Sequence, residues 1–190
     1  AGEPVLNLEL RLGYAHRGVE KLSEALSYDR GVLLAERISG DNGFSHALAY
    51  CQTVEGLASA QVPERALYLR TVYSELERLY NHMGDVAGIV LDTAYTPGAQ
   101  MAYLIRERLM DLNESVSGSR LLRSINCLGG VRMDMDHMTA LRISAFLVKV
   151  KLDFNDFKDK VLDMPSFLDR TEATGILSLE AARQLMVVGP

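Results

Sequence analysis

The stretch PERALYLRTVYSELERLYNHMGDVAGIVL, from Pro63 to Leu91, decides the fold class of this 190-residue chain. Its apolar side chains recur every three or four residues, and this spacing places them on one face of an α-helix. Pro63 suits the first turn of a helix, and Glu64 suits the positive end of the helix dipole. The pattern therefore predicts one helix of roughly 40 Å with a core-facing stripe. The stripe consists of Leu69, Val72, Leu76, Leu79, Met83, Val86 and Val90.

The sequence on either side of this stretch favours further helices, interrupted by glycine and proline. The segment Ser124–Asp134, with Gly129-Gly130, predicts a loop or an irregular strand. Alternating side chains from Val5 to Tyr14 predict a half-buried strand, which needs a preceding partner strand or else frays as an exposed edge. The other predicted helices cover residues 17–27, 29–38 and 44–59, a segment from the Thr96-Pro97-Gly98 turn to Gly118, residues 138–162, and a short segment after Ser178.

These patterns predict a mainly α fold, a bundle of long helices with a small N-terminal β strand or hairpin remnant. We expect residues 1–15 to form that remnant and residues 16–190 to form a single helical core domain. The absence of an initiator Met and the end of the chain directly after a helical pattern lead us to expect a segment of a larger subunit. Such a segment would be inactive alone and would expose faces that can drive self-association.

Composition limits the function classes. The chain has 20 Lys and Arg against 25 Asp and Glu, a formal net charge of −5. This balance offers no basic stripe for nucleic acid, so we expect no nucleic-acid partner. Two well-separated cysteines argue against a disulfide scaffold. No apolar run is long enough to span a membrane and no signal peptide is recognisable, so we expect a cytoplasmic location.

The stretch RISGDNGFSH, from Arg37 to His46, carries the strongest functional signal. Ser39 and Asn42 have the spacing of a Cys-x-x-Cys pair, but neither side chain supplies the soft, deprotonated sulfur that binds and tunes a redox metal. The glycines at 40 and 43 permit unusual backbone angles. The residues alone also fit a plain turn between two helices.

Four motifs in order carry a resemblance to one family. They are HRGVEK at 16–21, the stretch containing PER at 63–65, Arg70 and Glu77-Arg78, the loop SGSR at 117–120, and GGV at 129–131 followed by Asp134. Together they resemble the large, quinone-side subunit shared by respiratory complex I and membrane-bound nickel–iron hydrogenases of the formate-hydrogenlyase type. The resemblance covers the whole chain, and the frame from Arg37 to Phe44 is closer to the hydrogenase branch.

The resemblance implies roles for individual residues. Arg17 and Arg37 fall where arginines of the family approach an iron–sulfur cluster in a partner small subunit, and Asp92 falls on an aspartate near the quinone pocket. We therefore predict Asp92 and Arg37 as catalytic residues, and Arg17, His16 and Arg120 as cofactor-binding residues. We also expect residues 17, 37 and 92 to converge around the bend at 40–43. Without the family pattern, Arg17 would be expected to pair with Glu20.

Three departures from the family pattern narrow the chemistry. The tyrosine that contacts the quinone falls at Gly40, and the histidine beside the cluster falls at Leu122. The cysteines that hold nickel fall at Ser39 and Asn42. We therefore expect this segment to bind no cofactor itself: the iron–sulfur cluster belongs to the partner subunit, a quinone is possible, and a nickel–iron centre is not expected.

The resemblance implies the core domain of an oxidoreductase subunit, of the NADH:quinone or the hydrogenase kind. Electron transport and quinone and NAD binding are properties of such complexes. The expected partners are the iron–sulfur small subunit and other subunits of a membrane-bound complex, with this domain peripheral to the inner side of the membrane. A scaffold that has lost nickel and quinone chemistry is the first alternative. An unrelated helical protein-binding module is the second.

Overall fold

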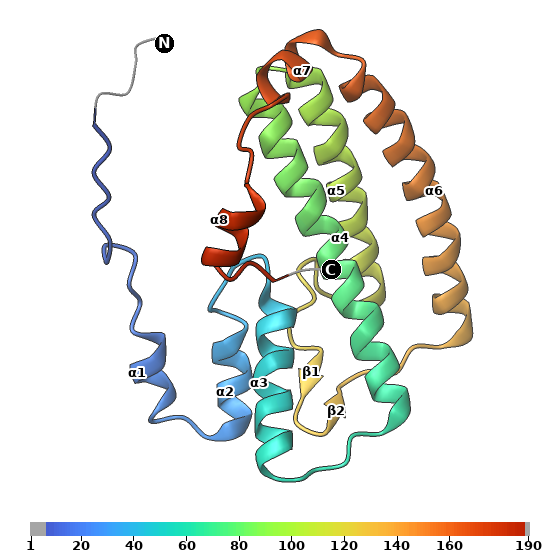
Figure 1. Ribbon diagram of the computed structural model, residues 1–190. Helices are drawn as coiled ribbons and strands as arrows, with labels where there is room; N and C mark the ends of the chain where they lie inside the picture. Colours follow the sequence, from blue (N-terminus) through green and yellow to red (C-terminus); the bar gives the residue numbers. More distant parts are fainter. Residues whose placement is uncertain (1–6, 189–190) are drawn as a thin grey trace.

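A computed structural model describes residues 7–188, and most of these residues lie in helices (Figure 1). Each long helix forms where the sequence pattern predicts it, within a few residues. The turn Thr96-Pro97-Gly98 differs, because these residues form the first turn of the second long helix rather than a separate turn. The helices are α1 Val19–Ser23, α2 Tyr28–Ala35, α3 Gly43–Leu57, α4 Glu64–Asp92, α5 Thr96–Ser117, α6 His137–Leu162, α7 Pro165–Thr171 and α8 Leu179–Gln184.

Local sequence signals define the ends of the helices. Asp136 caps α6 by accepting a hydrogen bond from the backbone N–H of Thr139 at 2.7 Å. Gly118 ends α5 with a φ of 75°, a left-handed conformation that glycine adopts without steric cost. Ser178 caps α8 by accepting from the N–H of Ala181. These caps explain why the predicted boundaries agree with the structure.

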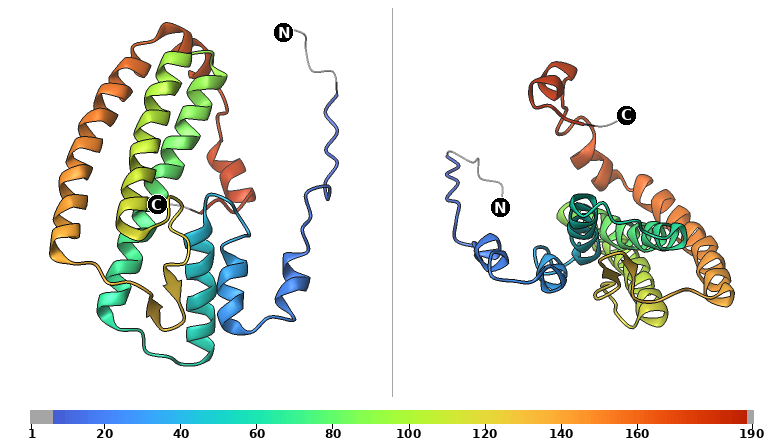
Figure 2. Two further views of the ribbon diagram at one scale, coloured as in Figure 1. Left: turned by 180° about the vertical axis from the view of Figure 1, so that it is seen from behind. Right: turned by 90° about the horizontal axis from the view of Figure 1, so that it is seen from below.

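The core lies where α4 and α5 pack along each other (Figure 1). The stripe predicted for α4 faces this core. Its residues Leu69, Leu76, Met83 and Val90 are buried, and Val72, Leu79 and Val86 are partly buried against the same core. The helix α6 packs mainly against α5, and the helices α2 and α3 pack against each other on the other side of α4 (Figure 2).

The small sheet lies inside the segment predicted as a loop or irregular strand. Strand β1, Asn126–Cys127, pairs antiparallel with strand β2, Gly130–Val131. The sheet contacts α3 through β1 and α4 through β2. Asn126 Nδ2 donates to the Phe44 carbonyl at 3.0 Å, so the segment after α5 is tied to the start of α3.

The predicted N-terminal strand is wrong for the part that the structure describes. Residues 7–14 form no strand, and their leucines are exposed along an extended chain that runs apart from the bundle (Figures 1 and 2). An alternating pattern creates one apolar face, but a strand also needs a hydrogen-bonded neighbour, which residues 7–188 do not provide. Residues 5 and 6 of the prediction lie outside the described residues. The division of the chain at residue 15 stays a prediction.

The exposed faces of the bundle include apolar side chains. On α6, Leu141, Val148 and Leu152 are exposed although they share one side of the helix. Among the described residues, no helix combines the length and the apolar composition needed to cross a membrane. Self-association through such faces stays a prediction.

Candidate functional site

The bend between α2 and α3 is held by side chains of α4. Tyr80 donates its hydroxyl hydrogen bond to the Asp41 carbonyl, and Asn81 Nδ2 donates to the same carbonyl at 3.2 Å and to Asn42 Oδ1 at 2.9 Å. Burial raises the pKa of Tyr80 well above its ordinary value, so the hydroxyl stays protonated and remains a donor. At Gly43 an added Cβ would lie 3.1 Å from the Glu36 carbonyl oxygen, so the bend leaves little room for a side chain there.

The first turn of α3 is anchored by a buried carboxylate. Glu77 is 1% exposed and accepts hydrogen bonds from the N–H groups of Phe44 at 2.8 Å and Ser45 at 2.9 Å, and also from the Ser45 hydroxyl. N–H groups in the first turn have no partner within the helix, and the positive end of the helix dipole favours a negative group. The sequence motifs contained Glu77 but gave it no role, because its partners are more than 30 residues away in the chain.

Ser39 and Asn42, which have the spacing of a Cys-x-x-Cys pair, contact each other in the structure. Asn42 Nδ2 donates to Ser39 Oγ at 3.3 Å. Both residues line a polar cavity of about 400 Å³ between the bend and α4. The other lining residues are Asp41, Ser45, Ser74, Glu77, Arg78, Asn81, His82 and Asp85.

These residues do not fit a nickel–iron centre. A hydroxyl and a carboxamide occupy the two positions, and neither is a soft anionic ligand. Burial raises the pKa of the Cys51 thiol to about 11, so this thiol stays protonated at neutral pH. Within residues 7–188, no three His, Cys, Asp or Glu side chains are grouped closely enough to hold a metal ion.

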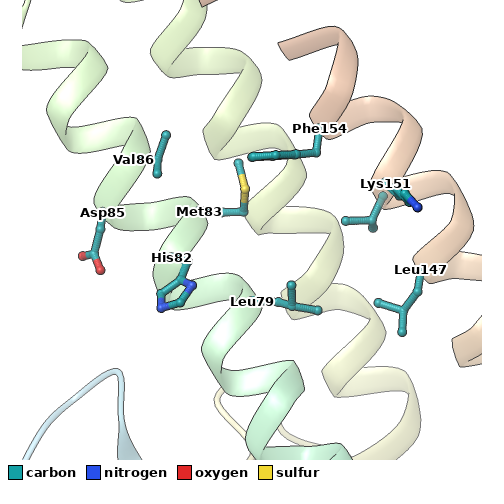
Figure 3. A pocket seen from close by; sticks show the side chains of 9 residues that line it. Leu79, His82, Met83, Asp85, Val86, Leu147, Lys151 and Phe154 are labelled. Atoms are coloured by element: carbon teal, nitrogen blue, oxygen red, sulfur yellow. The ribbon is translucent and has the colours of Figure 1, made fainter. Parts of the chain in front are cut away.

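A second, apolar cavity of about 590 Å³ lies between α4 and α6 (Figure 3). Met83 and Leu79 of α4 and Leu147 and Phe154 of α6 line it. His82 and Asp85 line both this cavity and the polar one, so α4 separates a polar site from an apolar groove.

The structure brings Arg17 to the bend. Arg17 Nη2 donates to the carbonyl of Ile38, which follows Arg37 in the sequence. Among the described residues, Arg17 makes no ion pair with Glu20. His16 has a local role, because its Nδ1 accepts from the N–H of Gly18 at 3.0 Å. Arg17 therefore contacts the backbone directly after Arg37, and the roles of Arg17, His16 and Arg37 stay predictions.

Asp92 and Arg120 do not join this group. Asp92 is exposed at the C-terminal end of α4, eleven residues after Asn81, which corresponds to about 16 Å along the helix axis. The prediction that residues 17, 37 and 92 converge around the bend is therefore wrong for Asp92, because a long stretch of one helix separates it from the bend. Arg120 forms ion pairs with Glu107 at 2.5 Å and Asp111 at 2.6 Å.

Arg123, which the sequence analysis did not select, does reach the bend. Its Nη2 donates to the Gly40 carbonyl at 3.4 Å. Leu122, at the position of a histidine in the family pattern, is fully buried with a φ of 54°. The backbone turn at 122–124 thus directs the arginine toward the bend and the leucine into the core.

Glu36 lies beneath the bend and is 2% exposed. Its Oε1 accepts from the N–H of Ser124 at 2.6 Å. Burial raises the pKa of Glu36, and the Ser124 hydrogen bond and the nearby Arg123 and Arg37 oppose that rise. No sequence signal marked Glu36, because its burial depends on the distant loop after α5.

A separate buried ion pair holds the small sheet against the helices. Arg70 contacts Glu55 at 2.6 and 2.9 Å, and it also donates to the carbonyls of Cys127 and Gly130 at 3.0 Å. The Gly129 N–H donates to Glu55 at 2.8 Å. The hydrogen bond from Arg70 lowers the pKa of Glu55. This network is structural and lies outside the polar cavity.

Comparison with known proteins decides the family. Residues 92–190 match the family model described as respiratory-chain NADH dehydrogenase, 49 kDa subunit. The chain belongs to this family. The prediction made from the four motifs is therefore confirmed.

Relatives of this 49 kDa-subunit family member come from several complexes. The chain is 32% identical to formate hydrogenlyase subunit 5 of Escherichia coli over 190 residues, covering all of this chain and 33% of that protein. It is 34% identical to a subunit of the NADH-quinone oxidoreductase of Clostridium beijerinckii, covering all of this chain and 51% of that protein. The chain thus spans a third to about half the length of these relatives.

A solved structure confirms the fold. A chain in the structure of membrane-bound sulfane sulfur reductase, an archaeal respiratory membrane complex, matches with a TM-score of 0.81 and 26% sequence identity. The match covers 87% of this chain and 45% of the other. The mainly helical fold predicted from sequence agrees with this neighbour.

Proposed function

We propose that this chain forms the core domain of the large subunit of a membrane-associated, energy-converting oxidoreductase. In this proposal the bend at residues 38–43 lies next to an iron–sulfur cluster in a partner subunit, and electrons pass through that partner. Family membership supports the proposal, and so do the relatives named as subunits of a formate hydrogenlyase and an NADH-quinone oxidoreductase.

The contact between Arg17 and the Ile38 carbonyl carries the proposal. It joins the HRG motif to the bend, two sequence features that lie 21 residues apart. Fixed positive charge beside a reducible centre stabilises its reduced form and raises its reduction potential. Arg17 and Arg37 would therefore tune and orient the partner's cluster, while the redox chemistry belongs to the cofactor.

The remaining selected residues lie outside this arrangement. Two carboxylates neutralise Arg120, and Asp92 is distant from the bend, so a role for Asp92 in quinone binding requires a second site near the end of α4. Gly40 offers no side chain to a quinone head group. The domain would be attached to the inner side of the membrane through partner subunits.

The test uses the complete complex with Arg37→Ala or Arg17→Ala in the large subunit. We expect the midpoint potential of the partner's cluster, followed by electron paramagnetic resonance during a redox titration, to fall in each variant. Lys149→Ala on the exposed side of α6 is the control and should leave the potential unchanged. An unchanged potential in both arginine variants would refute the proposed role.

A non-catalytic scaffold is the second candidate, and the replacement of both ligand positions by Ser39 and Asn42 favours it. Such a subunit would transmit conformational change between partners without contacting a reacting group. In that case the complex would assemble normally, and neither arginine variant would alter electron transfer. The redox titration of the two arginine variants separates the two candidates.

A further inference from the structure

Glu36 occupies a point at which three parts of the chain meet. It ends α2, where its N–H donates to the Val32 carbonyl at 3.2 Å. A Cβ added at Gly43 would lie 3.1 Å from the Glu36 carbonyl oxygen, so the start of α3 packs directly against it. Its side chain accepts from the N–H of Ser124 at 2.6 Å, in the turn at residues 122–124. Glu36, which is 2% exposed, thus joins α2, the bend and this turn.

The turn at residues 122–124 has a strained backbone. Leu122 has a φ of 54° and Ser124 a φ of 61°, in the left-handed region that costs free energy for residues with a side chain. Such conformations persist only where surrounding contacts fix them. Here Leu122 is fully buried, the Arg123 N–H donates to Ser119 Oγ at 3.0 Å, and the Ser124 N–H donates to Glu36. The Glu36 side chain is therefore one of the contacts that hold the turn in place.

This turn carries a positive charge to the bend. Arg123 Nη2 donates to the Gly40 carbonyl at 3.4 Å, and its buried Nε has no hydrogen-bond partner among the described residues. Arg123 lies between the two residues with positive φ, so a movement of the turn also moves its guanidinium group. The position of this charge at the bend depends on the turn keeping its conformation.

The surroundings of Glu36 disfavour a negative charge on its side chain. Burial removes the carboxylate from water, and the C-terminal end of α2 is the negative end of the helix dipole. The Ser124 hydrogen bond and the nearby Arg123, Arg37 and Arg132 favour the charge. Burial is the largest influence, and the pKa of Glu36 is raised above its ordinary value of 4.5.

Two further groups near the bend do not reverse this balance. Cys51 of α3 faces Glu36, and its pKa of about 11 keeps the thiol neutral at physiological pH. Arg106 of α5 contacts the bend at Asp41 instead, with its Nη2 3.9 Å from Asp41 Oδ2. The ionisation of Glu36 therefore sets whether this buried joint holds a negative charge.

The raised pKa determines which form of Glu36 favours the closed turn. A Glu36 side chain released into water has its ordinary pKa, so a proton binds more tightly while the turn is closed. Proton binding therefore favours the closed turn, fully below 4.5, and this effect is lost as the pH rises through the higher pKa of the closed state. The neutral carboxyl still accepts from the Ser124 N–H through its carbonyl oxygen.

We propose that Glu36 is a proton-operated switch: its neutral form keeps the turn at residues 122–124 closed on the bend, and its ionised form favours release of the turn. Release separates the Arg123 guanidinium from the Gly40 carbonyl. The positive charge at the bend thus follows proton binding at Glu36. The effect of this charge on a neighbouring cluster rests on the proposed function, whereas the switch itself lies within this chain.

The test measures amide hydrogen exchange by mass spectrometry in the full-length subunit within its complex, corrected for the intrinsic pH dependence of exchange. One unit of pKa shift corresponds to about a tenfold change in the opening equilibrium, so protection of the turn should fall about three- to tenfold from about pH 4 to about pH 8. Glu36→Gln keeps the size and the acceptor but cannot ionise, so its protection should not change with pH. Glu75→Gln on the exposed side of α4 is the matched control and should keep the unchanged profile.

An internal control comes from the cap of α6. Asp136 also accepts from a backbone N–H, that of Thr139 at 2.7 Å, but this hydrogen bond lowers the pKa of Asp136. Its carboxylate therefore stays ionised over the whole range, and the protection of the Thr139 amide should stay constant. A change at the turn without a change at this cap assigns the effect to Glu36 and not to general loosening of the fold.

Circular dichroism shows whether Glu36→Gln is folded, and the profile of the unchanged protein decides alone if it is not. Protection of the turn that stays constant or rises with pH would overturn the inference, and so would an equal fall in Glu36→Gln. The exchange measurement does not involve the cluster. If the turn responds to pH while the cluster potential ignores Arg17 and Arg37, the proposed function fails and the switch stands.

Discussion

The substitution Glu77→Ala tests how the bend is held. Glu77 accepts three hydrogen bonds at the start of α3, two from backbone N–H groups and one from the Ser45 hydroxyl. A hydrogen bond to a charged group contributes about 1.5–3 kcal/mol, and these contributions are not additive. Because alanine also leaves two N–H groups unpaired near the core, we expect the free energy of unfolding to fall by about 3–5 kcal/mol.

The assay is urea unfolding followed by far-ultraviolet circular dichroism. For a domain of this size the expected loss corresponds to a fall in Tm of about 10 °C. Glu75→Ala is the matched control, since Glu75 lies on the same helix and only pairs with Arg78 at the surface, where a change within about 0.5 kcal/mol is expected. A loss below about 1 kcal/mol for Glu77→Ala would refute the claim that this carboxylate anchors α3.

Three further predictions concern buried charges. Arg70→Met should lower the free energy of unfolding, measured with a chemical denaturant, by about 3–5 kcal/mol, because it leaves the buried Glu55 carboxylate without its partner. Adding Glu55→Gln should restore part of this loss. If the effects of the two substitutions were fully additive, the two residues would not be paired. The fold lowers the pKa of Glu55, so the ionised carboxylate stabilises the folded state above its ordinary pKa of 4.5, and this stabilisation is lost as the pH falls through the lower pKa of the folded state. In unfolding curves measured over a series of pH values, the stability of the Arg70→Met, Glu55→Gln double variant should therefore depend less on acid than that of the unchanged protein. Burial raises the pKa of Glu36, so ionising this carboxyl above its ordinary pKa of 4.5 opposes folding. Glu36→Gln should therefore increase the free energy of unfolding at pH 7 and leave it unchanged below pH 4.5. An equal effect of the substitution at both pH values would contradict this reasoning.

The sequence predicted the family and the long helices because both depend on local patterns. The stripe of α4, the glycine at 118 and the cap at Asp136 each act within one or two helical turns. The motifs identified the bend through residues that are close together in the chain.

Tertiary structure decided which charged groups meet at that bend. Arg123 and Arg106 reach it from distant parts of the sequence, whereas Asp92, selected by its motif, lies at the far end of α4. The apolar alternation at residues 7–14 formed no strand, because a strand depends on a neighbour that local sequence does not specify. Burial, long-range hydrogen bonds and the balance of charge at a site arise only when distant segments pack together, and for that reason the packing determined them here.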